Sequence, residues 1–151
     1  MPDTTRRRAP ILYWVSAVAL LLWALGGASI YVAYFTESPA EFAESAEAAA
    51  NREAYAEYVA NIPAWAIAVG IGAALTRLLG ASCLLLRRTW ALPFYVLSMV
   101  FFMVALYRAF VLADVAGVMS GPHIATEIVF LGLSVFAVWM AHWSKSKGIV
   151  K

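Results

Sequence analysis

The chain has 151 residues, of which 64% are apolar and only 13% are charged, with a formal net charge of +2. An ordinary soluble domain carries about 25% charged residues and, at this length, leaves roughly a third of its unfolded surface in water. Eleven Lys or Arg and nine Asp or Glu residues are too few to cover that surface, so the composition excludes a soluble globular domain.

Four apolar segments are each long enough to cross a bilayer as a helix. About 20 predominantly apolar residues are needed, because the hydrocarbon core is about 30 Å thick and each helical residue rises about 1.5 Å. The segments lack the period-2 alternation of barrel strands. The predicted spans cover residues 11–35, 64–86, 90–113 and 124–143. The sequence therefore predicts an all-α protein, an integral membrane four-helix bundle that forms one domain over residues 1–151.

The connection between the first two spans predicts an additional helix over residues 39–60. Ser38, Pro39 and Glu41 form a capping-box pattern, with a serine cap, a proline at the first helical position and a glutamate three residues after the cap. A short apolar stripe follows near its end: Tyr55, Tyr58, Val59 and Ile62. We favour a solvated helix whose last turns rest on the bundle or the membrane surface. The alternative is a lid or an acidic docking face.

Small residues recur every four positions along the second span. They are Ala64, Ala68, Gly72, Thr76 and Gly80. Such residues let helices approach closely in lipid, where apolar surface alone gives little drive to associate. We therefore interpret this face as a packing surface rather than a ligand site.

The distribution of basic residues predicts the orientation in the membrane. Cationic residues precede the first span, separate the second from the third and follow the fourth, whereas the other two connections are acidic. The basic residues that decide this are Arg6, Arg7, Arg8, Arg87, Arg88, Lys145, Lys147 and Lys151. Because short cytoplasmic segments carry the excess of Lys and Arg, both termini are expected in the cytoplasm of a bacterial inner-membrane protein.

Ionisable residues near the outer ends of the third and fourth spans predict an ion pair. Arg108 lies about 28 Å from the inner end of its span and Glu127 about 26 Å from the inner end of the next. Consecutive spans joined by a short loop are antiparallel neighbours, so we expect Arg108 and Glu127 to meet, with His123 one turn away. The pair either fixes the register of two helices or forms an outward-facing polar site.

Arg77 is expected near the middle of the bilayer, about 15 Å from the inner end of the second span. Ser98 and Ser134 lie at about the same height, 14–15 Å. One interpretation has Arg77 hydrogen-bonded to serines and backbone carbonyls, or extending toward the inner surface. The other has Arg77 holding an anionic or carbonyl-bearing ligand, such as a lipid headgroup or a quinone.

Catalytic and metal-binding patterns are not found in the sequence. Cys83 is the single cysteine, which excludes an intrachain disulfide, and it has no nearby base. His123 and His142 are too far apart for a helical metal pair. We therefore predict no catalytic residue, metal site or cofactor, and no nucleic-acid partner.

Interfacial aromatic residues and prolines carry a resemblance to a known group of proteins. They occur at Leu12-Tyr13-Trp14, Ser38-Pro39, Pro63-Ala64-Trp65-Ala66, Val138-Trp139 and the run from Leu84 to Pro93. In these features the chain resembles small bacterial four-span membrane proteins that are often labelled "sugar transporter" and are similar to DoxX-like bundles. The resemblance implies a bacterial inner-membrane four-helix protein and transfers no functional residue.

Three functional hypotheses follow from the sequence. The first is a non-enzymatic accessory or scaffold subunit of a membrane complex. The second is a carrier or channel for a small, sugar-like solute, with Arg77 lining the path. The third is a DoxX-like redox accessory that binds a lipid or a quinone. The expected partners are membrane lipid and either other membrane subunits or further copies of the chain.

Overall fold

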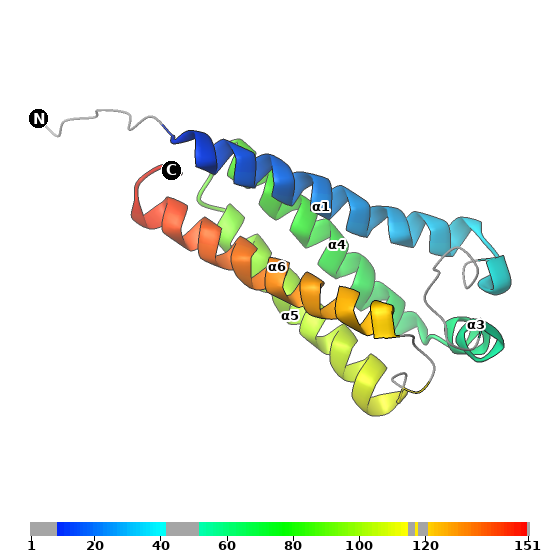
Figure 1. The fold of residues 1–151 in the computed structure, drawn as a ribbon. Coiled ribbons are helices and arrows are strands. Elements are labelled where there is room, and N and C mark those ends of the chain that lie inside the picture. Colours follow the sequence, from blue (N-terminus) through cyan, green and yellow to red (C-terminus); the bar gives the residue numbers. More distant parts are fainter. Residues whose placement is uncertain (1–8, 42–51, 115–116, 118–120, 151) are drawn as a thin grey trace, which may run out of the picture.

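The computed structural model describes residues 9–41, 52–114, 117 and 121–150, and the elements it describes are helical. Four long helices form the bundle and a short helix lies in the connection between the first two (Figure 1). Their bounds are α1 Ile11–Thr36, α3 Arg52–Ala60, α4 Ala64–Leu85, α5 Ala91–Tyr107 and α6 Gly121–Ser146, with a π-helical segment, η1 Arg108–Leu112, continuing α5. The predicted all-α four-helix bundle is therefore confirmed.

The four long helices have the length and hydropathy of membrane spans. The qualifying segments contain between 22 and 26 residues, and each is apolar enough to cross a bilayer. Large apolar side chains cover the outside of the bundle, for example Leu22 on α1, Val100 on α5 and Val129 on α6. An apolar exterior of this extent suits lipid rather than water as the surrounding solvent. The chain is a multi-pass membrane protein.

Figure 1 shows that α1 begins and α6 ends at one end of the bundle, while α3 lies at the opposite end. We refer to these as the termini end and the α3 end. The most tightly buried part of the core lies toward the termini end, where Tyr13, Leu20, Leu84 and Ala141 are almost fully buried. The Tyr13 hydroxyl donates a hydrogen bond to the Leu84 carbonyl, which ties α1 to the end of α4.

The C-terminal tail closes the termini end of the bundle. Gly148 has a left-handed backbone with φ of 66°, which ends α6. The Ile149 N–H donates to the Ser144 carbonyl at 2.9 Å and the Gly148 N–H donates to the Lys145 carbonyl at 3.0 Å, as in a Schellman cap. Arg87, between α4 and α5, donates from Nε to the Ile149 carbonyl at 2.8 Å. The tail is thereby folded back so that Ile149 is buried.

The glycines of α4 make room for aromatic rings from its neighbours. A Cβ atom on Gly80 would lie 3.1 Å from the Tyr95 ring, and one on Gly72 would lie 3.1 Å from the Phe101 ring. The Ser98 hydroxyl, also on α5, donates to the Ala73 carbonyl at 2.9 Å. The small-residue face predicted for this helix is therefore in part a seat for α5 side chains, not only a close contact between backbones.

The connection after α1 begins with the predicted capping box. The Ser38 N–H donates to the Glu41 carboxylate at 2.8 Å, and the Glu41 N–H donates to the Ser38 hydroxyl at 3.3 Å. The hydrogen bond from the Ser38 N–H, and after it the interaction with the Ser38 side chain, hold the pKa of the Glu41 carboxyl below its ordinary value. Of the helix predicted over 39–60, residues 39–41 and α3 are helical, and residues 42–51 lie outside the described residues.

Candidate ligand-binding cavity

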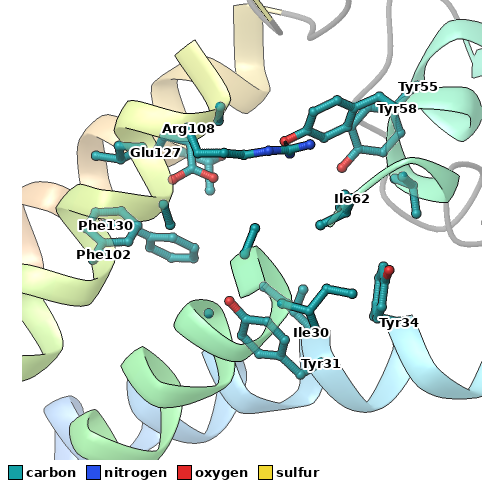
Figure 2. Close-up of a pocket in the computed structure, with 18 of the residues that line it drawn as sticks. Ile30, Tyr31, Tyr34, Tyr55, Tyr58, Ile62, Phe102, Arg108, Glu127 and Phe130 are labelled. Carbon is teal, nitrogen blue, oxygen red and sulfur yellow. Dashed lines mark hydrogen bonds between the residues drawn. The ribbon is translucent and has the colours of Figure 1, made fainter. Parts of the chain in front are cut away.

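A cavity of about 690 Å³ lies at the α3 end of the bundle. Its walls come from α1, α3, α4, α5, η1 and α6 (Figure 2). The volume falls within the range of about 300–1,000 Å³ that is typical of small-molecule sites. The lining is mostly apolar and includes six ionisable side chains: Tyr31, Tyr34, Tyr55, Tyr58, Arg108 and Glu127.

Arg108 supplies the positive charge on the wall of the cavity. It begins the π-helical segment η1, and its side chain is only 9% exposed. Its guanidinium donates a hydrogen bond to the Tyr58 hydroxyl and lies 4.6 Å from the centre of the Tyr58 ring. Single π-helical turns inside longer helices occur frequently at functional sites, because the extra residue changes where the following side chains point.

Glu127 lines the same cavity from α6. Figure 2 shows its carboxylate pointing into the cavity, while the Arg108 guanidinium extends away from it toward Tyr58. The structure therefore brings Arg108 and Glu127 to one cavity. Among the described residues, however, the hydrogen-bond partner of Arg108 is Tyr58 of α3 and not Glu127. No pattern in the sequence indicated Tyr58 as the competing partner of Arg108. The side chain of His123, the third residue of the predicted cluster, lies outside the described part of the chain.

The predicted apolar stripe of α3 forms one wall of the cavity. Tyr55 and Val59 are 6% and 3% exposed, and the Tyr55 and Tyr58 rings stack with their centres 6.0 Å apart. Burial raises the pKa of Tyr55 to about 12, and it raises the pKa of Tyr58 against the opposing effect of Arg108. The helix thus rests on the bundle, as expected, and it also covers a cavity. This second property favours the lid alternative over a merely solvated connection.

Arg77 lies behind the floor of the cavity rather than on its surface. Its side chain is 6% exposed, and its guanidinium carbon sits 4.2 Å from the centre of the Trp23 ring and 5.7 Å from that of Phe102. A Cβ atom on Gly27 would lie 3.1 Å from the guanidinium, so this glycine makes room for it. The Nε atom of Arg77 is buried and has no hydrogen-bond partner among the described residues. Ring faces are therefore its main neighbours.

The two serines predicted at the height of Arg77 bond to main-chain carbonyls instead. Ser98 donates to Ala73, and Ser134 donates to Phe130 on its own helix at 2.8 Å. Arg77 interacts electrostatically with Tyr31 and Glu127, which both line the cavity. The sequence placed Glu127 roughly 11 Å above Arg77, a separation that demanded helix tilt for a direct bridge. In the structure the opposite charges of Arg77 and Glu127 attract each other electrostatically.

Two of the four cavity tyrosines, Tyr31 and Tyr34, were not identified from the sequence. Tyr31 and Tyr34 lie near the end of a predicted span, where aromatic rings ordinarily anchor a helix in the membrane interface. In the structure a Cβ atom on Gly70 would lie 2.2 Å from the Tyr31 hydroxyl, so Tyr31 turns inward over this glycine. No local pattern distinguishes such an inward tyrosine from an anchoring one.

Comparison with protein-family models, with curated proteins and with solved structures found no match for this chain. The resemblance to DoxX-like four-span proteins therefore stays a prediction from the sequence. The functional argument depends on the cavity and the residues around it.

Proposed function

We propose that this chain is a non-enzymatic, multi-pass protein of the bacterial inner membrane that acts as an accessory subunit of a membrane complex. In this role it binds a small amphiphilic molecule in the cavity beneath α3. The cavity is the observation that carries the proposal. It joins a large apolar surface to a few ionisable groups, which is the usual composition of a binding site for small molecules.

The charge distribution supports cytoplasmic termini. The termini end carries the exposed cations Arg88, Lys145 and Lys147, and the α3 end carries the exposed acids Glu41, Glu53 and Glu57. Because Lys and Arg accumulate on the cytoplasmic side of short connections, the termini end faces the cytoplasm and α3 faces the opposite side. The cavity then lies at the outer side of the inner membrane.

A binding role accounts for the α3 end better than a purely structural scaffold does. A scaffold has no need of a cavity of about 690 Å³, because interiors are normally close-packed and unfilled volume weakens packing. Membrane lipid is the nearest source of an amphiphile. The resemblance to DoxX-like proteins agrees with a lipid- or quinone-binding accessory role.

The proposal is tested by filling the cavity. Ala66 lines the cavity, whereas Ala68, two residues further along α4, is exposed on the outside of the bundle. Ala66→Phe and Ala68→Phe add the same ring to the same helix, so Ala68→Phe is the matched control. The measurement is mass spectrometry of the amphiphiles that are extracted from each variant after purification in mild detergent.

We expect a stoichiometric amphiphile in the wild type and in Ala68→Phe, and its loss in Ala66→Phe. Equal retention by both variants would show that the bound molecule lies elsewhere and would remove the basis of the proposal. Solute flux into liposomes by the purified protein alone would assign the chain to the carriers instead.

A further inference from the structure

We infer that the ligand of this cavity carries an acidic headgroup, a phosphate or carboxylate oxyanion, which Arg108 recognises with Tyr58. This inference rests on the proposed function, because it specifies the chemistry of the molecule that the cavity binds. It is carried by three observations: the charge balance around the cavity, the partners of Arg108, and the depth at which the polar and apolar walls lie.

The first observation is an excess of positive charge. Arg77 and Arg108 are both buried, and Glu127 is the acidic residue among the described side chains that line the cavity. Glu127 attracts Arg77 across the cavity floor. Burying charge without an opposite charge is costly, most of all inside a membrane. A ligand with one negative charge balances the excess.

The second observation is that the partner of Arg108 is neutral. Its hydrogen bond goes to the Tyr58 hydroxyl, and it lies over the Tyr58 ring. A guanidinium has five N–H donors in a planar fork that suits the two oxygens of a carboxylate or phosphate. The hydroxyl of Tyr58 is itself a donor, so guanidinium and phenol together present donors to an oxyanion.

The third observation is the depth of these groups. Helix α5 has 17 residues, so Arg108 stands about 26 Å from its start, close to the full thickness of the hydrocarbon core. Phe102 comes six residues earlier and lies about 9 Å deeper. The cation is therefore at headgroup level and the aromatic wall is at acyl-chain level. This arrangement suits an acidic amphiphile that enters from the leaflet on the α3 side.

The experiment compares three ligands with native mass spectrometry of the full chain in detergent. The probes are phosphatidylglycerol, a diacylglycerol with the same acyl chains, and water-soluble glycerol 3-phosphate. We expect phosphatidylglycerol to bind about tenfold more tightly than the diacylglycerol, as expected when a charged hydrogen bond is gained. Glycerol 3-phosphate binding as tightly as the lipid would support the oxyanion chemistry and identify a soluble phosphate ester as its source.

Two substitutions of Arg108 distinguish an effect of its charge on lipid binding from misfolding of the variant. Arg108→Gln is expected to lower the affinity for phosphatidylglycerol about tenfold, to that of the diacylglycerol, while diacylglycerol binding is unchanged. Arg108→Lys keeps the positive charge but loses the planar fork, so its preference for phosphatidylglycerol is expected to fall between those of the wild type and Arg108→Gln, and its binding of both lipids also shows that the position tolerates replacement. Arg88→Gln is the matched control, because Arg88 is an exposed arginine at the termini end. The Arg88→Gln variant shows how much lipid binds to basic residues outside the cavity. We expect it to keep the preference for phosphatidylglycerol over the diacylglycerol.

Equal binding of phosphatidylglycerol and diacylglycerol by the wild type, with both abolished by Ala66→Phe, would overturn the inference and leave the proposed function standing. A preference lost in Arg88→Gln rather than in Arg108→Gln would also overturn it. Binding that is unaffected by Ala66→Phe for every probe would overturn the proposed function itself.

Discussion

Two arginines are buried in neighbouring helices, and each is accommodated by different chemistry. The Arg108 guanidinium donates a hydrogen bond to the Tyr58 hydroxyl and lies over the Tyr58 ring. Arg77 has the faces of Trp23 and Phe102, with a through-space attraction to Glu127. A guanidinium tolerates this because it is planar, weakly hydrated and attracted to aromatic faces. Lysine has none of these properties to the same degree, so Arg and Lys are not interchangeable at position 77.

The attraction between Arg77 and Glu127 is tested by a double-mutant cycle. Arg77→Gln and Glu127→Gln each leave the other charge buried, whereas the double variant removes both. We expect the two single effects on the free energy of unfolding to exceed the effect of the double variant by about 1 kcal/mol. The measurement is denaturant unfolding in detergent for all four proteins. Additive effects would show that the two groups do not interact.

The ionisation of Tyr55 predicts a pH dependence at the α3 end. Burial raises its pKa from the ordinary value of 10.0 to about 12 in the folded protein. Because the folded state favours the neutral phenol, this contribution to stability is complete below pH 10 and is lost as the pH rises through 12. The tyrosinate absorbance of the wild type minus that of Tyr55→Phe should show a midpoint near pH 12. A midpoint near pH 10 would mean that the ring is exposed.

At the scale of elements, α4 determines how the bundle is assembled. It packs against both α1 and α5, and its contact with α5 is the most extensive in the bundle. Glycines on α4 accept rings from both sides: Gly70 receives Tyr31 of α1, and Gly80 receives Tyr95 of α5. The position of Tyr31 in the cavity thus depends on the absence of a side chain on the facing helix.

Substituting Gly70 tests this dependence. A Cβ atom at Gly70 would lie 2.2 Å from the Tyr31 hydroxyl and 2.8 Å from its ring, so Gly70→Ala requires the ring to move. We expect Gly70→Ala to destabilise the bundle by about 1–3 kcal/mol, the usual cost of overpacking. Gly26→Ala is the control, because no atom of the described residues lies within 4 Å of a Cβ atom there.

Since alanine favours the helix over glycine by about 1 kcal/mol, Gly26→Ala should be neutral or stabilising. Thermal unfolding of both variants in the same detergent provides the comparison. Equal melting temperatures would mean that the Tyr31 ring moves aside at no cost.

At the scale of the whole molecule, the two ends of the bundle differ in charge and in packing. The termini end is closed by a buried C-terminal tail, which Arg87 ties to the turn between α4 and α5. The α3 end holds the cavity and the exposed acids. The two ends therefore differ: the termini end is closed and basic, and the α3 end contains the cavity and is acidic. This asymmetry predicts one orientation of the protein in the membrane.

That orientation is tested with single cysteines in a Cys83→Ala background. Glu53→Cys places a thiol on an exposed position of α3, and Lys147→Cys places one on an exposed position at the termini end. With a membrane-impermeant maleimide on intact cells whose outer membrane is made permeable, we expect labelling of Glu53→Cys alone. Lys147→Cys should be labelled only after the inner membrane is opened. The reverse pattern would invert the orientation, and the cavity would then face the cytoplasm.

Hydropathy and local pattern were sufficient to predict the four long helices and the capping box at Ser38 and Glu41. Both depend on residues close together in the chain, and an apolar span tolerates wide variation in which residues supply it. Two details of the spans escaped prediction. The end of the third span becomes the π-helical segment η1, and α6 extends three residues beyond the predicted bounds at each end, Gly121 and Ser146. Capping and packing decide such ends, and neither is visible in a hydropathy pattern.

The sequence by itself determined that this chain has four helices long and apolar enough to cross a membrane, with the exposed cations Arg88, Lys145 and Lys147 at one end of them, because hydropathy and charge can be summed over each segment. The tertiary structure alone decided that Tyr31 turns inward, that Arg108 bonds to Tyr58 and that Arg77 lies against Trp23. Each of these depends on how helices are rotated about their axes, where one residue changes the direction of a side chain by about 100°. The cavity takes side chains from α1, α3, α4, α5, η1 and α6, and only the joint placement of these helices brings Arg108 and Glu127 to one site.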